Sequence, residues 1–380
     1  MKVAVLTLPL HTNYGGNLQA YALMETLKLL ECEPLFIRRA KERRSLKSWC
    51  VILLKRFIKC LKVRSFESLL PEFKESRETP FTNYYSEIFI KDWIIPSSVP
   101  IRSSGQLADV ILESKMDAVI VGSDQVWRPS YAPNIYDYFL GFLSENKSIK
   151  KITYAASFGT RDWLFDTLQT ERCSHLLREF DSVSVREDSA VTMCQERFGV
   201  IARHVLDPTM LIPLSLYRNV VTDKDLVKYN YSSISYVLDE ADDVGRLMDH
   251  IDNYFNGELI RINSRIENKD APLVERIAPS VSSWLASFMN SEYVVTDSFH
   301  ACVFSILFNK KFFVYCNPKR GKSRFESLLK MFDLESRMIS SIEDFDGIVE
   351  QEIDWSGVNQ QVSLERENSL SYLRGALFGE

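Results

Sequence analysis

Short apolar strand patterns alternate with helical patterns along most of the chain, and this alternation restricts the fold more than any other feature of the sequence. The strand-like KVAVLTL at residues 2–8 is followed by a helical pattern at residues 17–31, in which Leu23, Leu27 and Leu30 recur at helical spacing. Further strand patterns begin at residues 117, 151, 181 and 202. Short strands separated by helices are typical of a parallel sheet covered on both faces.

A second α/β series follows a polar stretch at residues 217–233. With 380 residues the chain exceeds the roughly 250–300 residues at which a single core stops growing, so two domains are expected. We predict an N-terminal domain at residues 1–215, a C-terminal domain at residues 216–345, and a tail at residues 346–380 whose helix packs back on the N-terminal domain. Ligands of open parallel sheets bind at the carboxyl ends of the strands, so polar residues that directly follow strands are of most functional interest.

Charge and cysteine usage exclude several classes of protein. The net charge of −5 argues against a general nucleic-acid binder, and no apolar run approaches the roughly 20 residues that span a bilayer. Met1 leads directly into a strand pattern instead of a signal peptide, so we expect a cytoplasmic protein. The seven cysteines contain no CxxC pair, and no cluster has the spacing of metal ligands, which favours reduced thiols and no metal site.

One segment is strongly basic. The residues from Arg38 to Arg64 include eleven Lys or Arg and a single acid, Glu42, interleaved with apolar residues. This composition suits an amphipathic helix that lies on an anionic membrane, which would hold the protein at the inner face of the plasma membrane. The alternative is a solvated basic helix that packs on its own domain.

The first loop of the N-terminal domain ends in Gly15 and Gly16, and Asn17 is the expected cap of the following helix. Amides at such a helix start suit an anion or sugar hydroxyls, although a plain tight turn would use the same residues.

A second loop, VIVGSDQVWRP at residues 119–129, places Asp124, Gln125 and Trp127 after a buried strand. An indole face with nearby carboxylate and amide groups suits a carbohydrate. Loop capping by Asp124 and core packing by Trp127 are the alternative.

Two further positions carry cations that suit a phosphate or carboxylate. Arg186 ends the strand pattern DSVSVRE just ahead of a helix for which Asp188 is the expected cap, although a salt bridge with Glu187 or Asp188 would also explain it. A later loop contains four cations, Lys319, Arg320, Lys322 and Arg324. They could close over a bound anion, or they could form a solvated basic surface.

The strongest candidate for chemistry is the stretch VVTDSFHACVFSI at residues 294–306, where Asp297 and His300 lie between a strand pattern and a helical pattern. A histidine can act as acid or base near neutral pH, whereas a satisfied structural donor is the alternative. No HExxH, P-loop, GxSxG or GxGxxG motif occurs, which argues against zinc proteases, P-loop kinases, serine hydrolases and nicotinamide enzymes.

Six motifs in order, NYGGNLQAYAL, VGSDQVWRP, AASFG, SVREDSAV, LDPTML and VVTDSFHACVFSI, resemble those of the polysaccharide pyruvyl transferase family. The resemblance implies a fold like that of GT-B glycosyltransferases, with two Rossmann-like domains that face a cleft. It also implies transfer of a pyruvyl group from phosphoenolpyruvate to a sugar, as a ketal on two hydroxyls, during synthesis of a bacterial capsule, exopolysaccharide or cell-wall glycan. Phosphoenolpyruvate is then the donor substrate, and no cofactor is implied.

The resemblance also implies roles for single residues. His300 and Arg186 match the family's donor-binding histidine and arginine, and the AASFG motif with Ser157 and Gly159 belongs to the same donor side. Many family members have an arginine where this chain has Ser298. The missing charge is then expected to come from the later basic loop, through Arg320 or Arg324.

On this interpretation His300 protonates the methylene carbon of phosphoenolpyruvate, and Asp297 either orients His300 or caps the helix. The acceptor sugar, or a sugar carried on a lipid diphosphate, is expected to face the residues Asn13, Tyr14, Asn17, Asp124, Gln125 and Trp127. Two alternatives are a GT-B glycosyltransferase that uses a nucleotide sugar and a catalytically silent glycan-binding protein.

Overall fold

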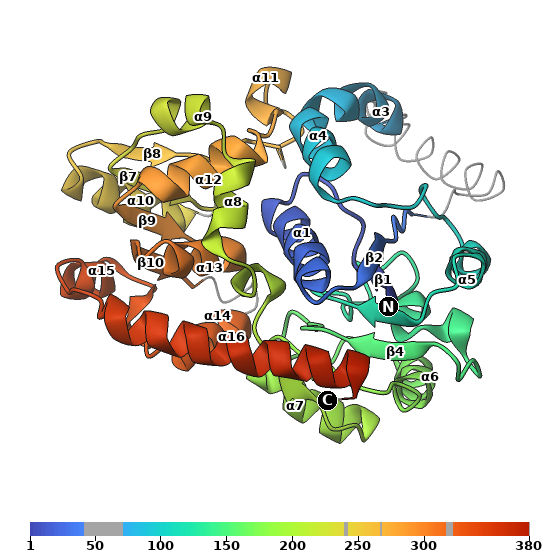
Figure 1. Cartoon of the computed structure of the whole chain (residues 1–380). Helices are drawn as coiled ribbons and strands as arrows, with labels where there is room; N and C mark the ends of the chain where they lie inside the picture. The colour runs from blue at the N-terminus through green and yellow to red at the C-terminus, as the bar shows by residue number, and fades with distance from the viewer. Residues whose placement is uncertain (42–70, 239–241, 267, 317–321, 380) are drawn as a thin grey trace, which may run out of the picture.

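The computed structural model describes residues 1–41, 71–238, 242–266, 268–316 and 322–379, and is built on two parallel sheets (Figure 1). The first sheet has the order β2-β1-β3-β4, and all its pairs are parallel. Its strands are β1 (Lys2–Leu6), β2 (Glu33–Phe36), β3 (Ala118–Val121) and β4 (Lys150–Thr153). A short parallel pair, β5 (Ser184–Val185) and β6 (Arg203–His204), continues beyond β4 through isolated bridges.

The second sheet has the order β11-β10-β9-β7-β8 and is also parallel throughout. Its strands are β7 (Ser233–Tyr236), β8 (Leu259–Arg261), β9 (Tyr293–Thr296), β10 (Lys311–Tyr315) and β11 (Met338–Ile339). The strands β3 and β9 are buried along most of their length, which explains their nearly continuous apolar sequences.

Helices cover the sheets and connect their strands. With the first sheet lie α1 (Tyr14–Leu29), α3 (Pro71–Thr82), α4 (Tyr84–Trp93), α5 (Ser104–Glu113), α6 (Thr167–Leu177) and α7 (Asp188–Met193). With the second lie α8 (Leu214–Val220), α9 (Asp223–Lys228), α10 (Asp242–Tyr254), α11 (Leu273–Arg276), α12 (Val281–Asn290), α13 (Phe299–Leu307), α14 (Lys322–Met331) and α15 (Ile342–Ile348).

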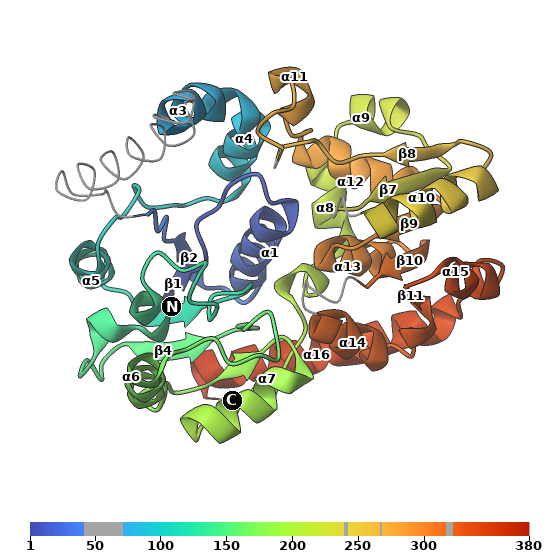
Figure 2. The same cartoon turned by 180° about the vertical axis from the view of Figure 1, so that it is seen from behind.

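One apolar cluster joins the two halves of the molecule. Leu18 and Leu23 of α1 belong to the same buried cluster as Trp284 of α12 and Phe304 of α13. Aromatic contacts run through this seam, because Tyr217 lies 6.3 Å from Tyr21 and 5.0 Å from Phe304, measured between ring centroids. The halves are therefore packed against each other along α1, and Figure 2 shows α1 facing α13.

The last helix, α16 (Trp355–Phe378), runs from the second half back to the first sheet (Figures 1 and 2). The hydroxyl of Tyr372 donates to the carbonyl of Thr153, and Lys150 Nζ donates to the carbonyl of Leu377. The helix thus fastens the end of the chain to strand β4.

The basic segment at residues 38–64 falls outside the described residues beyond Lys41, as does Arg320. Within the described part of the chain, no helix has the length and apolar character that crossing a membrane requires.

Candidate active site

A cleft of about 790 Å³ lies between the carboxyl ends of the two sheets. The first sheet contributes the loops after β1 and β3, and the second contributes the loops after β7, β8 and β9 together with Arg324 of α14. Its walls carry the cations Arg128, Arg261, Arg265 and Arg324 and the acids Asp124 and Asp297. His300 lines this cleft, as does His11. The arrangement suits a ligand that carries several negative charges.

A buried ionic cluster lies directly beneath His300. Arg186 donates from Nη1 to Asp207 Oδ2 at 2.8 Å and from Nη2 to Asp124 Oδ1 at 3.3 Å. His300 Nε2 lies 3.5 Å from the same Asp207 oxygen, without the alignment of a hydrogen bond. The side chains of Asp207 and Arg186 are 0% and 1% exposed, so these charges interact with little screening by water.

The cluster shifts the pKa of two of its members, Asp207 and Arg186. Burial would raise the pKa of Asp207, but His300 and Arg186 outweigh it and hold that pKa well below its ordinary value. Burial would likewise lower the pKa of Arg186, but the charges of Asp207 and Asp124 raise it. His300 therefore lies beside a carboxylate that stays ionised near neutral pH.

His300 is also packed against the beginning of α1. A Cβ added at Gly15 would lie 1.9 Å from His300 Nδ1 and 2.3 Å from its Cγ, so only glycine allows this approach. The neighbouring Gly16 is different, because a Cβ there would meet no atom closer than the Asn13 Cγ at 3.6 Å.

We expect Gly15→Ala to displace the His300 ring and to lower turnover about 100-fold, the lower end of the effect of a positioned acid or base. Gly16→Ala is the matched control, since alanine there makes only ordinary van der Waals contact, and it should keep turnover within a few-fold of the original. The measurement is phosphate release from phosphoenolpyruvate, the donor that the sequence resemblance implies. Equal rates for the two variants would show that the position of the ring against Gly15 is unimportant.

Phe299 lines the cleft next to His300, and its ring lies close to two cations. The guanidinium of Arg186 lies 4.5 Å from the centroid of the Phe299 ring, and that of Arg324 lies 5.9 Å from it. Burial, followed by the charge of Arg186, lowers the pKa of Arg324 to about 10. A cation that is desolvated and faces a second cation gains from an incoming anion, so Arg324 is well placed to bind one.

The loop after β9 presents Asp297 and Ser298 to the cleft. Asp297 Oδ1 accepts a hydrogen bond from the backbone N–H of Leu238 at 2.7 Å, which ties this loop to the end of β7. Ser298 precedes α13 as its N-cap residue, without a side-chain capping bond. A carboxylate that lies beside His300 is that of Asp207, at 3.5 Å. The two predicted roles of Asp297, orienting His300 or capping the helix, stay predictions.

The model of one family matches the chain over most of its length. It is described as polysaccharide pyruvyl transferase and covers residues 13–317. The chain belongs to this family. No curated protein sequence matches the chain.

Solved structures with a similar fold are enzymes of the GT-B type. The UDP-GlcNAc 2-epimerase from Neisseria meningitidis bound to UDP-GlcNAc has a TM-score of 0.58 at 10% identity, with 100% of both chains covered. A UDP co-structure of S. aureus MnaA has a TM-score of 0.55 at 11% identity, covering 100% of this chain and 98% of that one. A glycosyltransferase from Rickettsia africae has a TM-score of 0.55 at 10% identity and covers 100% and 99%. The predicted GT-B-like α/β fold is thus confirmed.

Three residues predicted on the donor side lie beneath the cleft instead of lining it. Besides Arg186, these are Ser157 and Gly159 of the family motif AASFG. Glu187 Oε1 accepts from Ser157 Oγ at 2.8 Å and from Gly159 N at 3.3 Å. Gly159 has a φ of +77°, and a Cβ there would lie 2.0 Å from Gln125 Oε1. Ser157 and Gly159 therefore support the loop after β3, and Arg186 pairs with Asp207 and Asp124 beneath the cleft. Donor binding by these three residues stays a prediction.

Trp127 is a core residue, which corrects its predicted stacking on the acceptor sugar. The indole is fully buried, stacks on Phe139 with a centroid distance of 5.3 Å, and donates its N–H to the carbonyl of Tyr138 at 3.1 Å. Because both faces and the polar edge are used inside the protein, Trp127 anchors the loop. Asp124 and Gln125 of the same loop do line the cleft.

The start of α1 corrects two further predictions. The helix begins at Tyr14, and Asn13 is its cap, because the Asn13 side chain accepts from Gly16 N. Asn17 is buried inside the first turn and donates to the carbonyl of His11. Tyr14 stacks on Trp284 across the seam between the halves. Of these predicted acceptor residues, only Asn13 lines the cleft.

Sequence reasoning missed Asp207 and Arg128 as site residues. Asp207 belongs to the motif LDPTML and follows shortly after the short strand β6. The rule that polar residues just after strands are of functional interest would therefore have included it. Arg128 lines the cleft, with its guanidinium 4.4 Å from the Tyr131 ring centroid and its Nη1 bonded to Gln125.

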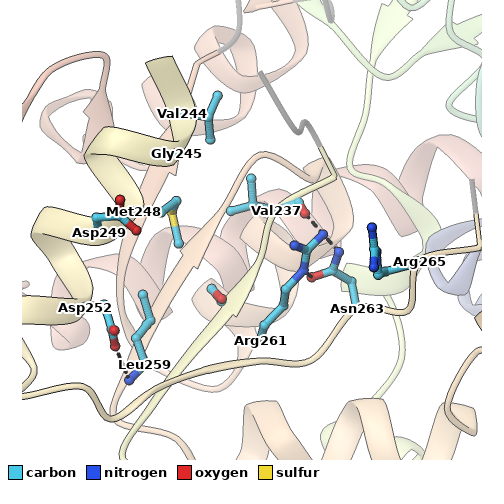
Figure 3. Close-up of a pocket in the computed structure, with 11 residues that line it drawn as sticks. Val237, Val244, Gly245, Met248, Asp249, Asp252, Leu259, Arg261, Asn263 and Arg265 are labelled. Atoms are coloured by element: carbon cyan, nitrogen blue, oxygen red, sulfur yellow. Dashed lines mark hydrogen bonds between the residues drawn. The ribbon is translucent and has the colours of Figure 1, made fainter. Parts of the chain in front are cut away.

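A second hollow, of about 610 Å³, opens beside the cleft between α10 and the strands β7 and β8 (Figure 3). Val237, Met248 and Leu259 give it an apolar floor, and Asp249 and Asp252 of α10 form one side. Three residues line both hollows, namely Arg261, Asn263 and Arg265. Asn263 is held there by a bond to the carbonyl of Val237 and another from Arg261 Nε.

Proposed function

We propose that the protein transfers a pyruvyl group from phosphoenolpyruvate to a sugar, as a ketal on two hydroxyls, in the synthesis of a bacterial surface polysaccharide. The observation that carries this proposal is the position of His300. It lies over the buried, ionised Asp207 and faces a cleft lined with cations. Family membership supports pyruvyl transfer as the reaction class.

The donor would bind next to the wall formed by Phe299 and Arg324. Phosphoenolpyruvate carries a carboxylate and a phosphate, and two arginines of the cleft, Arg324 and Arg128, come from opposite halves of the molecule. Guanidinium groups bind both kinds of anion through paired hydrogen bonds. Arg324 then supplies the charge that many family members obtain from an arginine at the position of Ser298.

The chemistry requires an acid at the donor's methylene carbon. His300 gives a proton to that carbon, which becomes a methyl group and leaves C2 electrophilic. A sugar hydroxyl then forms a bond to C2 and loses its proton. The bond from C2 to the phosphate oxygen breaks, phosphate departs, and a second hydroxyl adds to C2 with loss of its proton, which closes the ketal. Asp207 stabilises the charged imidazole before the transfer.

The acceptor would occupy the other wall of the cleft, near Asn13, Asp124 and Gln125. Further sugars or a linked phosphate would extend past Arg261 and Arg265 toward the second hollow. An acceptor carried on a lipid diphosphate would give the basic segment at residues 38–64 a purpose, because that segment would hold the cleft close to the membrane.

Thermal stabilisation by phosphoenolpyruvate tests the proposal. At a tenfold excess over Kd, a ligand stabilises the folded state by about 1.4 kcal/mol, so Tm should rise with phosphoenolpyruvate and not with UDP or phosphate at the same concentration. Arg324→Ala should weaken binding about 10- to 100-fold, since a hydrogen bond to a charged group contributes about 1.5–3 kcal/mol.

Arg265→Ala is the matched control, because Arg265 lines the same cleft but is bonded to Glu275 at 2.9 Å. The Arg265→Ala variant should keep the rise in Tm with phosphoenolpyruvate. A shift with UDP alone would replace the proposal by nucleotide-sugar transfer, and retention of the shift in Arg324→Ala would remove Arg324 from the donor site.

A further inference from the structure

The loop after β3 carries a row of three side chains along the wall of the cleft. Gln125, Arg128 and Tyr131 all line the cleft. The backbone N–H of Arg128 donates to the carbonyl of Gln125, and the N–H of Tyr131 donates to the carbonyl of Arg128, both at 3.0 Å. Side chains three residues apart lie next to each other in successive turns of this kind. The backbone of the loop therefore sets the three side chains side by side.

Contacts within the row hold the Tyr131 ring in place. Arg128 Nη1 donates to Gln125 Oε1 at 3.2 Å, and the guanidinium carbon of Arg128 lies 4.4 Å from the centroid of the Tyr131 ring. The guanidinium thus covers one face of the ring. The loop is anchored by Trp127, whose indole is buried and whose backbone N–H donates to the carbonyl of Ser157 at 3.2 Å. A ring held in this way loses little freedom when a ligand binds to it.

Tyr131 differs from the other aromatic rings of the cleft in its exposure. Among the described residues that line the cleft, Phe299, Tyr236 and Tyr131 are the phenylalanine and tyrosines. Phe299 and Tyr236 are 5% and 8% exposed, so the protein uses most of their surface, whereas Tyr131 is 46% exposed. Because Arg128 covers one face of the Tyr131 ring, the opposite face is the one left for a ligand. An accessible aromatic face with polar groups beside it is typical of a ligand site.

We propose that the acceptor sugar stacks on this open face of Tyr131, with Asp124 and Gln125 as the hydrogen-bonding partners of its hydroxyls. The inference rests on the proposed function, which takes the acceptor to be a sugar. A pyranose ring presents C–H groups on its faces, and an aromatic ring covers such a surface, while carboxylate and amide groups bond the hydroxyls at its edge. Tyr131 then takes the stacking role that the sequence assigned to the buried Trp127.

Saturation-transfer NMR with the full chain tests this proposal. The probes are the methyl pyranosides of glucose, galactose and mannose, added without donor. Tyr131→Ser removes the ring, and Tyr131→Phe removes only the hydroxyl. Tyr84→Ser is the control, since Tyr84 is 56% exposed on α4 and lies outside the cleft lining. We expect at least one glycoside to bind the original chain, about tenfold weaker binding to Tyr131→Ser, and little change in Tyr131→Phe or Tyr84→Ser.

Three outcomes would overturn the proposal. The first is equal binding by the original chain and Tyr131→Ser, and the second is no binding of any of the three glycosides to the original chain. The third is a loss in Tyr131→Phe as large as that in Tyr131→Ser, which would assign the contact to the hydroxyl instead of the ring. An unchanged Tm of the variants without ligand shows that the comparison concerns folded protein.

The rise in Tm of the original chain with phosphoenolpyruvate distinguishes this inference from the proposed function. Sugar binding that depends on Tyr131, without such a rise, would keep the stacking surface and remove pyruvyl transfer. A rise with phosphoenolpyruvate, together with sugar binding that does not depend on Tyr131, would remove only the stacking surface.

Discussion

Replacing His300 by glutamine should lower the rate of phosphate release from phosphoenolpyruvate by about 10²–10⁴-fold, the range typical of a positioned acid or base. Glutamine keeps a polar side chain of similar length but cannot transfer a proton to carbon. Because His300 is proposed to act in the chemical step, the loss should appear in kcat, with KM for phosphoenolpyruvate changed much less. Steady-state phosphate release at saturating donor is the measurement.

The matched control is His11→Gln, since His11 lines the same cleft and accepts a hydrogen bond from Asn17 Nδ2 through its backbone carbonyl, which glutamine keeps. Its rate should stay within a few-fold of the original. An equal fall in the two variants would contradict the assignment of His300 as the acid. A rise in KM alone for His300→Gln would leave it a donor-binding residue.

Asp207→Asn should destabilise the protein by about 3–5 kcal/mol, which is the usual cost of removing one partner from a buried ion pair. Asparagine preserves shape, but Arg186 and His300 then lie in a buried site with one carboxylate fewer. Asp124→Asn is the control. Asp124 makes a longer contact of 3.3 Å with Arg186 and its side chain is 11% exposed, so this variant should lose less stability than Asp207→Asn. Urea denaturation measures the free energy of unfolding of both variants.

The same variant should change the response to acid. Because the pKa of Asp207 is lower in the folded than in the unfolded protein, its contribution to stability is complete above about pH 4 and is lost as the pH falls below that value. Asp207→Asn removes this contribution, so its stability should fall less steeply than that of the original between pH 5 and pH 3. Parallel curves for the two proteins would show that Asp207 does not ionise differently on folding.

The sequence was sufficient to predict the fold class and the side of each sheet that holds the cleft. Apolar strands followed by polar residues led directly to Asp297, His300 and Arg324, because parallel strands bring their carboxyl ends to one edge. The same rule cannot tell which side of a loop a residue faces. It therefore assigned Trp127 to the cleft, although the indole turns into the core.

The ionic cluster could not be predicted from the sequence, for a different reason. Asp207, Arg186 and Asp124 come from three separate loops, and the pairing depends on distances that no local pattern encodes. The helix start at Asn13 was misjudged by one turn, since Asn13 and Asn17 are both residues that commonly cap helices.

The apolar seam between the halves has a consequence for folding. In a protein whose domains meet only across a ligand, each domain can open or melt separately. Here each half contributes side chains to the core of the other. Tyr14 stacks on Trp284, and α16 is hydrogen-bonded to β4. We therefore expect one cooperative unit, in which neither half is a stable protein when expressed alone and a defect at the seam weakens the whole chain.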